Sequence, residues 1–179
     1  MFFGVSALGA TAAFSVATAW AWKSGRLKLG SIDLPSAILP PIAGLQELGS
    51  PVPGVNTTSR SDKPLILNFW ASWCPYCRSE HPILMQLSRD SRVKLIGVVM
   101  DDTHDAVAQY LTDHGNPFSE VSIDRSRLIV RAMRQRGIPS TLLVPAGETR
   151  VVAKFIGPLT PIVVAEQFLP HFSGQTALG

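Results

Sequence analysis

The strongest constraint on this chain is a pair of cysteines, Cys74 and Cys77, separated by two residues in the stretch NFWASWCPYCRSEHP (68–82). They are the only cysteines among the 179 residues. A disulfide between them would close a very short loop, so it would stabilise the fold little through chain entropy. The apolar fraction of 46% is enough for a core without such a link. The pair therefore points to chemistry rather than to a structural link.

Strands and helices alternate along the sequence around this motif. Short apolar runs indicate strands, and segments that end in glycine or begin with proline indicate helices. The expected strands are 65–71, 93–100 and 119–124, the expected helices are 75–90, 101–115, 125–137 and 160–172, and a hairpin is expected at 140–157 with its turn at Ala146–Gly147. This order predicts an α/β sandwich around a mixed central sheet.

Cys74 falls where the first strand ends and a helix begins. Unpaired backbone N–H groups and the positive end of the helix dipole stabilise a thiolate at that place. Pro75 fixes the first turn of the helix, and Cys77 lies one turn further in, where it can attack a mixed disulfide formed at Cys74. We therefore expect an exposed, reactive thiolate at Cys74 and a sheltered resolving thiol at Cys77. A CxxC pair next to a βαβ pattern favours disulfide exchange.

Metal binding and nucleic-acid binding are the alternatives for such a chain. Cys77 and His81 are four residues apart and share a helix face, but zinc usually takes four ligands and a second Cys/His pair is absent from the sequence. Net charge is +3, Lys and Arg are scattered, and no stacking aromatics lie among them, which argues against nucleic acid. The prediction is no metal, no cofactor and no nucleic acid, while a metal-delivery module stays open.

Glu80 occupies an unexpected place on the helix that follows the cysteines. The stripe that should face the core consists of positions 80, 83, 84 and 87, so the acid takes a core position one turn after Cys77. Burial raises the pKa of a carboxyl towards the range of a proton shuttle. The alternative is that Glu80 lies at the edge of the stripe and reaches water or Arg78. His81 is expected at the surface, and Asn68, if it points inward, can only hydrogen-bond.

The N-terminal segment is the part of the chain that could contact a membrane. Residues 1–22 carry no charged side chain, and as a helix they would extend about 33 Å, enough to span a bilayer. We expect a membrane anchor there, with a signal peptide cleaved near Ala17–Ala19 as the alternative. Lys23, Arg26 and Lys28 follow it, and the positive-inside rule would place the remainder in the cytosol. Proline-rich sequence then predicts a tether at 23–45, a folded domain at 46–173 and a flexible tail at 174–179.

The motif NFWASWCPYC, followed by Pro82, resembles the thioredoxin superfamily, and RGIPST (136–141) matches that family's loop before a strand. LILNFWASWCPYCRSEHP (65–82) and GNPF (115–118) are similar to the cytochrome c biogenesis thiol:disulfide interchange proteins, the CcmG/DsbE family. The resemblance implies a thioredoxin-like three-layer sandwich with a cis Ile138–Pro139 bond against the cysteines, and places Glu80 near the resolving cysteine. The residues expected to contact a target are Trp73, Pro75, Tyr76, Ile138 and Pro139.

The resemblance also implies a function and a cellular location. It implies an inner-membrane protein that faces the periplasm, takes electrons from a membrane donor of DsbD/CcdA type and keeps the haem-binding cysteines of apocytochrome c reduced. Its partners would be apocytochrome c or other thiol-handling maturation proteins. A general envelope thiol-disulfide reductase of TlpA/ResA type is the alternative. One departure is Ser140, because the family often carries an acid directly after the cis proline.

Overall fold

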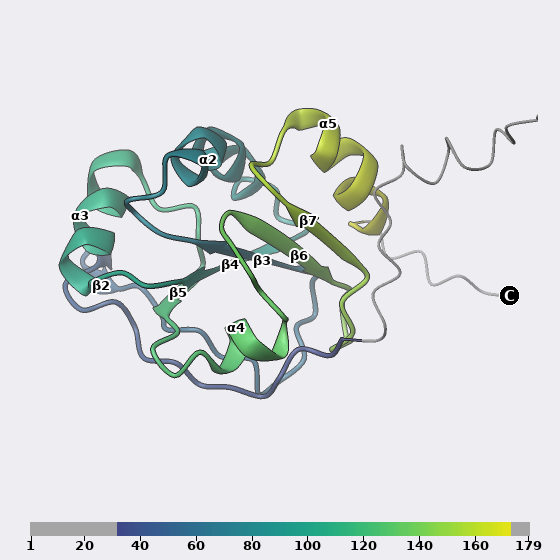
Figure 1. The fold of residues 1–179 in the computed structure, drawn as a ribbon, viewed down its shortest axis with the longest axis horizontal. Coiled ribbons are helices and arrows are strands. Elements are labelled where there is room, and N and C mark those ends of the chain that lie inside the picture. The colour runs from purple at the N-terminus through teal and green to yellow at the C-terminus, as the bar shows by residue number, and fades with distance from the viewer. Residues whose placement is uncertain (1–31, 173–179) are drawn as a thin grey trace, which may run out of the picture. The chain divides into compact units, whose positions relative to one another are not determined.

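A five-stranded mixed sheet forms the centre of the computed structural model, which describes residues 32–172 (Figure 1). Its strands are β3 (Leu65–Trp70), β4 (Lys94–Val99), β5 (Glu120–Ile123), β6 (Ser140–Val144) and β7 (Ala153–Ile156). The strand order is β5-β4-β3-β6-β7. β3, β4 and β5 are parallel, whereas β6 runs antiparallel to β3 and β7 antiparallel to β6. The mixed sheet and the hairpin predicted from the sequence are confirmed.

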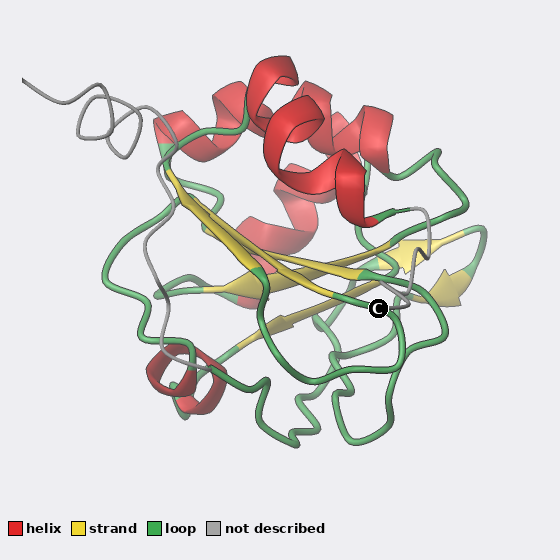
Figure 2. Cartoon of the chain, turned by 90° about the vertical axis from the view of Figure 1, so that its right-hand side faces the viewer, coloured by secondary structure: helices red, strands yellow, loops and turns green. Residues whose placement is uncertain are grey.

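Helices cover both faces of this sheet, which explains why every residue of β3 is buried. The helices α2 (Pro75–Leu87), α3 (His104–His114) and α5 (Pro161–Val163) lie on one face, and α4 (Leu128–Ala132) lies on the other (Figures 1 and 2). Right-handed crossovers from β3 to β4 and from β4 to β5 place α2 and α3 on the same side. The result is the three-layer sandwich that the resemblance implied.

Local signals set the ends of the helices. The Thr103 side chain caps α3 by accepting a hydrogen bond from the Ala106 backbone N–H at 3.3 Å, and α3 ends at His114, before Gly115, whose φ is 87°. Helix α4 is shorter than the predicted 125–137, because Arg127 and Arg134 on either side of it adopt left-handed φ values of 56° and 49°. The predicted C-terminal helix is divided into α5, a π-helical turn η1 (Val164–Phe168) and a 3₁₀ turn η2 (Leu169–His171).

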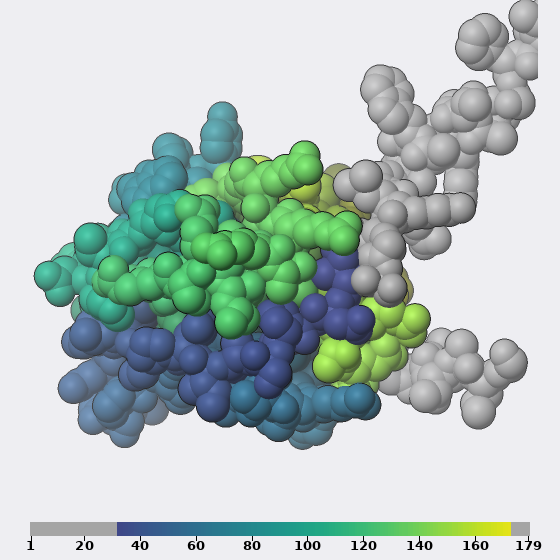
Figure 3. Space-filling model, turned by 60° about the horizontal axis from the view of Figure 1, so that its bottom comes forward, coloured from purple at the N-terminus to yellow at the C-terminus, as the bar shows by residue number. Residues whose placement is uncertain are grey.

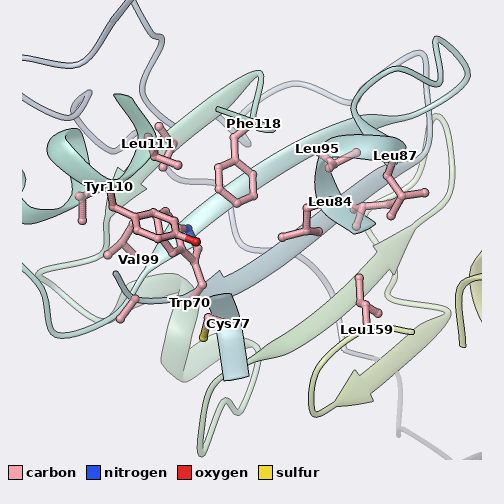
Figure 4. Packing of buried hydrophobic residues seen from close by; sticks show 14 of the residues in the cluster. Trp70, Cys77, Leu84, Leu87, Leu95, Val99, Tyr110, Leu111, Phe118 and Leu159 are labelled. Carbon is pink, nitrogen blue, oxygen red and sulfur yellow. The ribbon is translucent and has the colours of Figure 1, made fainter. Parts of the chain in front are cut away.

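The main core lies between the sheet and the α2–α3 side. Trp70, at the end of β3, stacks on Phe118 with ring centroids 5.4 Å apart and tilts against Tyr110 at 5.7 Å. Cys77 belongs to the same buried cluster and lies with Trp70 at one end of it in Figure 4. The second cysteine is therefore part of the core that joins α2 to the sheet.

Residues 32–45 belong to the folded domain, where the sequence predicted a tether. Leu34, Ile42 and Leu45 are buried, and the Leu34 backbone N–H donates to the Thr149 carbonyl at 2.7 Å. A small hairpin of β1 (Gln46–Glu47) and β2 (Ser50–Pro51) follows. The purple segment along one face of Figure 3 is this part of the chain. Its prolines prevent regular structure, but its apolar side chains still pack against the domain.

The N-terminal anchor predicted at 1–22 and the tail predicted at 174–179 lie outside the described residues. Within residues 32–172, no helix has the length and apolar character that a membrane crossing requires.

Candidate active site

The two cysteines lie on the first turn of α2. Cys74 is the N-cap residue, and its Sγ accepts a hydrogen bond from the Cys77 backbone N–H at 3.3 Å. Pro75 occupies the first turn, as expected. Neither Cys74 nor Cys77 forms a disulfide in this structure. The cap places the Cys74 sulfur at the N-terminal end of the helix, where it faces the Cys77 backbone N–H.

Cys74 is more buried than the sequence predicted. Its exposed fraction is 3% and that of Cys77 is 4%, so the exposed thiolate expected at Cys74 is wrong. The reason is the capping geometry, because the sulfur folds back onto the first helical turn to accept the Cys77 N–H. Trp73 and Tyr76, in contrast, are 56% and 66% exposed. A target sulfur must therefore reach a recessed Cys74 that lies among exposed aromatic rings, or the loop must move.

Glu80 has no exposed surface and lies in a buried hydrogen-bond network. Its Oε1 accepts from the Asn68 Nδ2 at 2.7 Å, and its Oε2 accepts from the Leu159 backbone N–H at 2.7 Å. The same Asn68 Nδ2 donates to the Thr141 Oγ1 at 3.1 Å. The core position predicted for Glu80 is confirmed. The edge alternative is wrong, since the Arg78 Nε donates instead to the Ser72 carbonyl at 2.7 Å.

The electrostatics of this network prepare Glu80 to exchange a proton near neutral pH. Burial raises the pKa of Glu80 to about 7, although the hydrogen bonds from Leu159 and Asn68 favour the ionised form. Burial also raises the pKa of Cys77 far above its ordinary range, and the hydrogen bond with Cys74 and the charge of Glu80 act in the same direction. A thiol held in this way needs a base, and Glu80 is the carboxyl that lies one turn away.

Two members of the Glu80 network could not be found from sequence alone. The Leu159 contact uses a backbone N–H, which leaves no signature in the side chains. Thr141 contacts Asn68 because these residues are paired across β3 and β6, and that register is a tertiary property. The inward, hydrogen-bonding role expected of Asn68 is confirmed.

His81 is buried, contrary to the prediction that it lies at the surface. Its exposed fraction is 7%, and its Nε2 donates towards the carbonyls of His114 at 3.2 Å and Gly115 at 3.1 Å. Its ring meets Tyr110 edge-on at 5.2 Å, because α3 packs across this face of α2. Burial lowers the pKa of His81, which favours the neutral ring. Among residues 32–172, no three His, Cys, Asp or Glu side chains come together as a metal site would require.

The proline loop lies at the same end of the sheet as the cysteines. The Ile138–Pro139 bond is cis, as the resemblance implied. Ser140 pairs with Phe69 near the end of β3, so the loop before β6 reaches the place where the chain leaves β3 towards Cys74. Ile138 packs against the buried cluster that contains both cysteines. The structure thus brings together the dithiol, the buried acid and the loop that were predicted separately.

A dithiol held on the first turn of a helix, beside a cis-proline loop in this three-layer fold, defines the class of the protein as a thiol:disulfide oxidoreductase with a thioredoxin-like fold. A family model described as Redoxin matches residues 35–167. By the similarities that follow, the chain belongs to the CcmG/DsbE family of thiol:disulfide interchange proteins.

Two curated relatives and one solved structure illustrate this membership. The thiol:disulfide interchange protein HelX of Rhodobacter capsulatus is 33% identical over 75% of this chain and 75% of its own length. The thiol:disulfide interchange protein DsbE homolog of Paracoccus denitrificans is 32% identical over 80% of each chain. A thiol:disulfide interchange protein of the thioredoxin family from Chlorobium tepidum has the same fold, with a TM-score of 0.59 at 23% identity over 74% of this chain and 90% of that one.

Proposed function

We propose that this protein is a reductant of cytochrome c maturation, which keeps the haem-binding cysteines of apocytochrome c reduced. Its catalytic domain faces the periplasm, and its N-terminal residues attach it to the inner membrane. Membership of the thiol:disulfide interchange family supports the chemistry. The observation that carries the proposal is Glu80, a buried carboxyl whose pKa is raised to about 7, one helical turn after Cys77.

The reaction passes two electrons from the dithiol to a target disulfide. The Cys74 thiolate attacks one sulfur of the target, a mixed disulfide forms, and the other target sulfur leaves as a thiolate. Cys77 then loses its proton and attacks the Cys74 sulfur. This step forms the Cys74–Cys77 disulfide and releases the second target thiolate, so the target is reduced and the protein is oxidised.

Glu80 accepts the proton in the second step. Near pH 7 its carboxyl is ionised in about half of the molecules, and burial then favours the neutral acid that forms when it takes the Cys77 proton. The hydrogen bonds from Asn68 and Leu159 hold both carboxyl oxygens in place throughout. A membrane donor of DsbD/CcdA type afterwards reduces the Cys74–Cys77 disulfide, and Glu80 returns a proton to Cys77.

The test is to trap the partners of Cys74 in intact cells. Cys77→Ala removes the resolving thiol, so mixed disulfides at Cys74 should accumulate, and the double variant that also lacks Cys74 is the matched control. Apocytochrome c among the trapped proteins is the expected result. Trapping of other envelope proteins without apocytochrome c would replace the proposal with a general reductase of TlpA/ResA type. Metal retained on purification, with no disulfide reduction by the wild type, would favour a metal-delivery module.

A further inference from the structure

A concentration of arginine leads into the cis-proline loop. Residues 125–136 contain five arginines and no acidic residue. The basic side chains are therefore concentrated here, although they are scattered over most of the chain. Arg131, Arg134 and Arg136 are exposed. Among the ion pairs of residues 32–172, only one involves this segment, between Arg127 and Asp101 at 3.5 Å. Four guanidinium groups on this segment, all but that of Arg127, are therefore available to a partner.

Hydrogen bonds to the neighbouring strands fix the position of this segment. The Lys154 ammonium on β7 donates to the carbonyls of Met133 at 3.1 Å and Arg134 at 3.3 Å. The Ser140 hydroxyl donates to the Gln135 Oε1 at 2.6 Å. Ser140 is the position where the family often has an acid, so here the residue after the proline holds the basic segment and adds no negative charge.

Arg136 and Lys154 carry like charges near each other, and neither belongs to an ion pair within residues 32–172. Burial, and then the positive charge of Arg136, lower the pKa of Lys154. Arg136 is therefore close enough to Lys154 for their charges to interact. A negatively charged partner would relieve this repulsion, and carboxylates match the planar guanidinium group in two parallel hydrogen bonds.

Arg136, the last of these arginines, precedes the loop beside which a target must approach Cys74, whereas Arg131 belongs to α4 on the opposite face of the sheet. Arg136 is three residues before Pro139, at the end of the sheet from which the chain leaves β3. Ile156 on β7 pairs with Ser140 and is 60% exposed, and Trp73 and Tyr76 are also exposed. The surface around the dithiol thus combines exposed apolar side chains with the basic side chain of Arg136 next to the cis-proline loop.

We propose that Arg134 and Arg136, with Lys154 close to both, select polypeptide targets that carry acidic side chains close to the reacting disulfide. The selection rests on the proposed function, because it acts on the same exchange at Cys74. Complementary charge at the border of an interface raises the rate of association and favours one class of partner. An anionic membrane would offer the same charge, but a bilayer seated on this loop would block access to Cys74, so a polypeptide is favoured.

The experiment compares disulfide peptides that differ only in the residues beside the disulfide: aspartates, asparagines or lysines. With the wild type, kcat/KM for the acidic peptide should exceed that for the neutral peptide about five- to tenfold at low salt, and high salt should reduce the difference. The double substitution Arg134→Gln and Arg136→Gln should remove the preference and leave reduction of the neutral peptide unchanged. The matched control is Lys63→Gln with Arg89→Gln, which removes two exposed cations at the opposite end of the sheet and should keep the preference.

Each other outcome has a defined meaning. Equal rates for the three peptides, or a preference that survives in the Arg134/Arg136 variant, would overturn the proposal. Loss of binding to phosphatidylglycerol vesicles in that variant, without a change in peptide preference, would assign the segment to a membrane surface instead. Failure of the wild type to reduce even the neutral peptide would count against the proposed function itself, and this result is distinguishable from failure of the selectivity.

Discussion

Replacement of Glu80 by glutamine tests the electrostatics of the site through the stability of the fold. The carboxyl has an ordinary pKa of 4.5 and a folded-state pKa of about 7. Below pH 4.5 it is neutral in both the folded and the unfolded chain. As the pH rises from 4.5 towards 7, the unfolded chain ionises first, so the folded state loses stability, and above pH 7 the loss is complete.

The size of this loss follows from the two pKa values. Each pKa unit corresponds to about 1.4 kcal/mol, so the complete loss is about 3 kcal/mol. Between pH 5 and pH 8, where most of the titration takes place, the free energy of unfolding should fall by about 2–3 kcal/mol on account of this group. Because Glu80 has no exposed surface, solvent does not screen it. Glutamine cannot ionise, so the variant should not show this loss.

The assay is denaturant unfolding of the reduced protein at pH 5 and pH 8. Relative to the wild type, the free energy of unfolding of Glu80→Gln should rise by about 2–3 kcal/mol on going from pH 5 to pH 8. Any constant cost of fitting the glutamine amide cancels in this comparison. Glu166→Gln removes an exposed carboxyl and serves as the control. If wild type and Glu80→Gln change in parallel with pH, Glu80 does not titrate as inferred, and its role as proton acceptor for Cys77 loses its basis.

Three further predictions concern the same region. Asn68→Ala removes a hydrogen bond to the Glu80 carboxylate, so the pKa of Glu80 should rise above 7 and the free energy of unfolding should fall by about 1–3 kcal/mol. Unfolding measured as a function of pH reports both quantities, and an unchanged pKa would contradict the hydrogen-bond network. Gly97→Ala would place a Cβ 2.9 Å from the Phe118 ring, so the free energy of unfolding measured in denaturant should fall by about 1–3 kcal/mol. An unchanged free energy of unfolding would mean that the ring moves freely. Because Cys74 is 3% exposed, N-ethylmaleimide should alkylate it much faster than a bulky maleimide does, and equal rates in timed mass spectrometry would show that the loop opens readily.

The elements next to the cysteines could be predicted from sequence because their signals are local. The apolar run of β3, the proline at the start of α2 and the glycine after α3 each lie within the element that they define. The burial of Glu80 followed from the helical period alone. The features that the sequence did not predict depend on distant segments. His81 is covered by α3, and residues 32–45 are held by contacts such as that between Leu34 and Thr149.

Cys74 shows how a correct local prediction can still give a wrong exposure. Its place at the helix N-terminus was predicted, but the direction of its side chain was not, and the direction decides how much of the sulfur a target meets. The same limit applies to the arginines of residues 125–136. Along the sequence they resemble an ordinary solvated helix, and only the pairing of β3 with β6 brings the loop that follows them to the dithiol.

The charged side chains around the dithiol form two groups that share no hydrogen-bond or ion-pair partner. Glu80 is buried under α2 and bonded to Asn68 and Leu159, whereas Arg134 and Arg136 are exposed on the loop and have no ion-pair contact with it. Effects of substitutions at separate sites without common contacts add. The free-energy effect of Glu80→Gln on proton transfer and that of the paired arginine substitutions on target choice should therefore sum in the combined variant. A large departure from additivity would mean that the loop charges reach the buried carboxyl, so that the bound target itself alters the proton transfer.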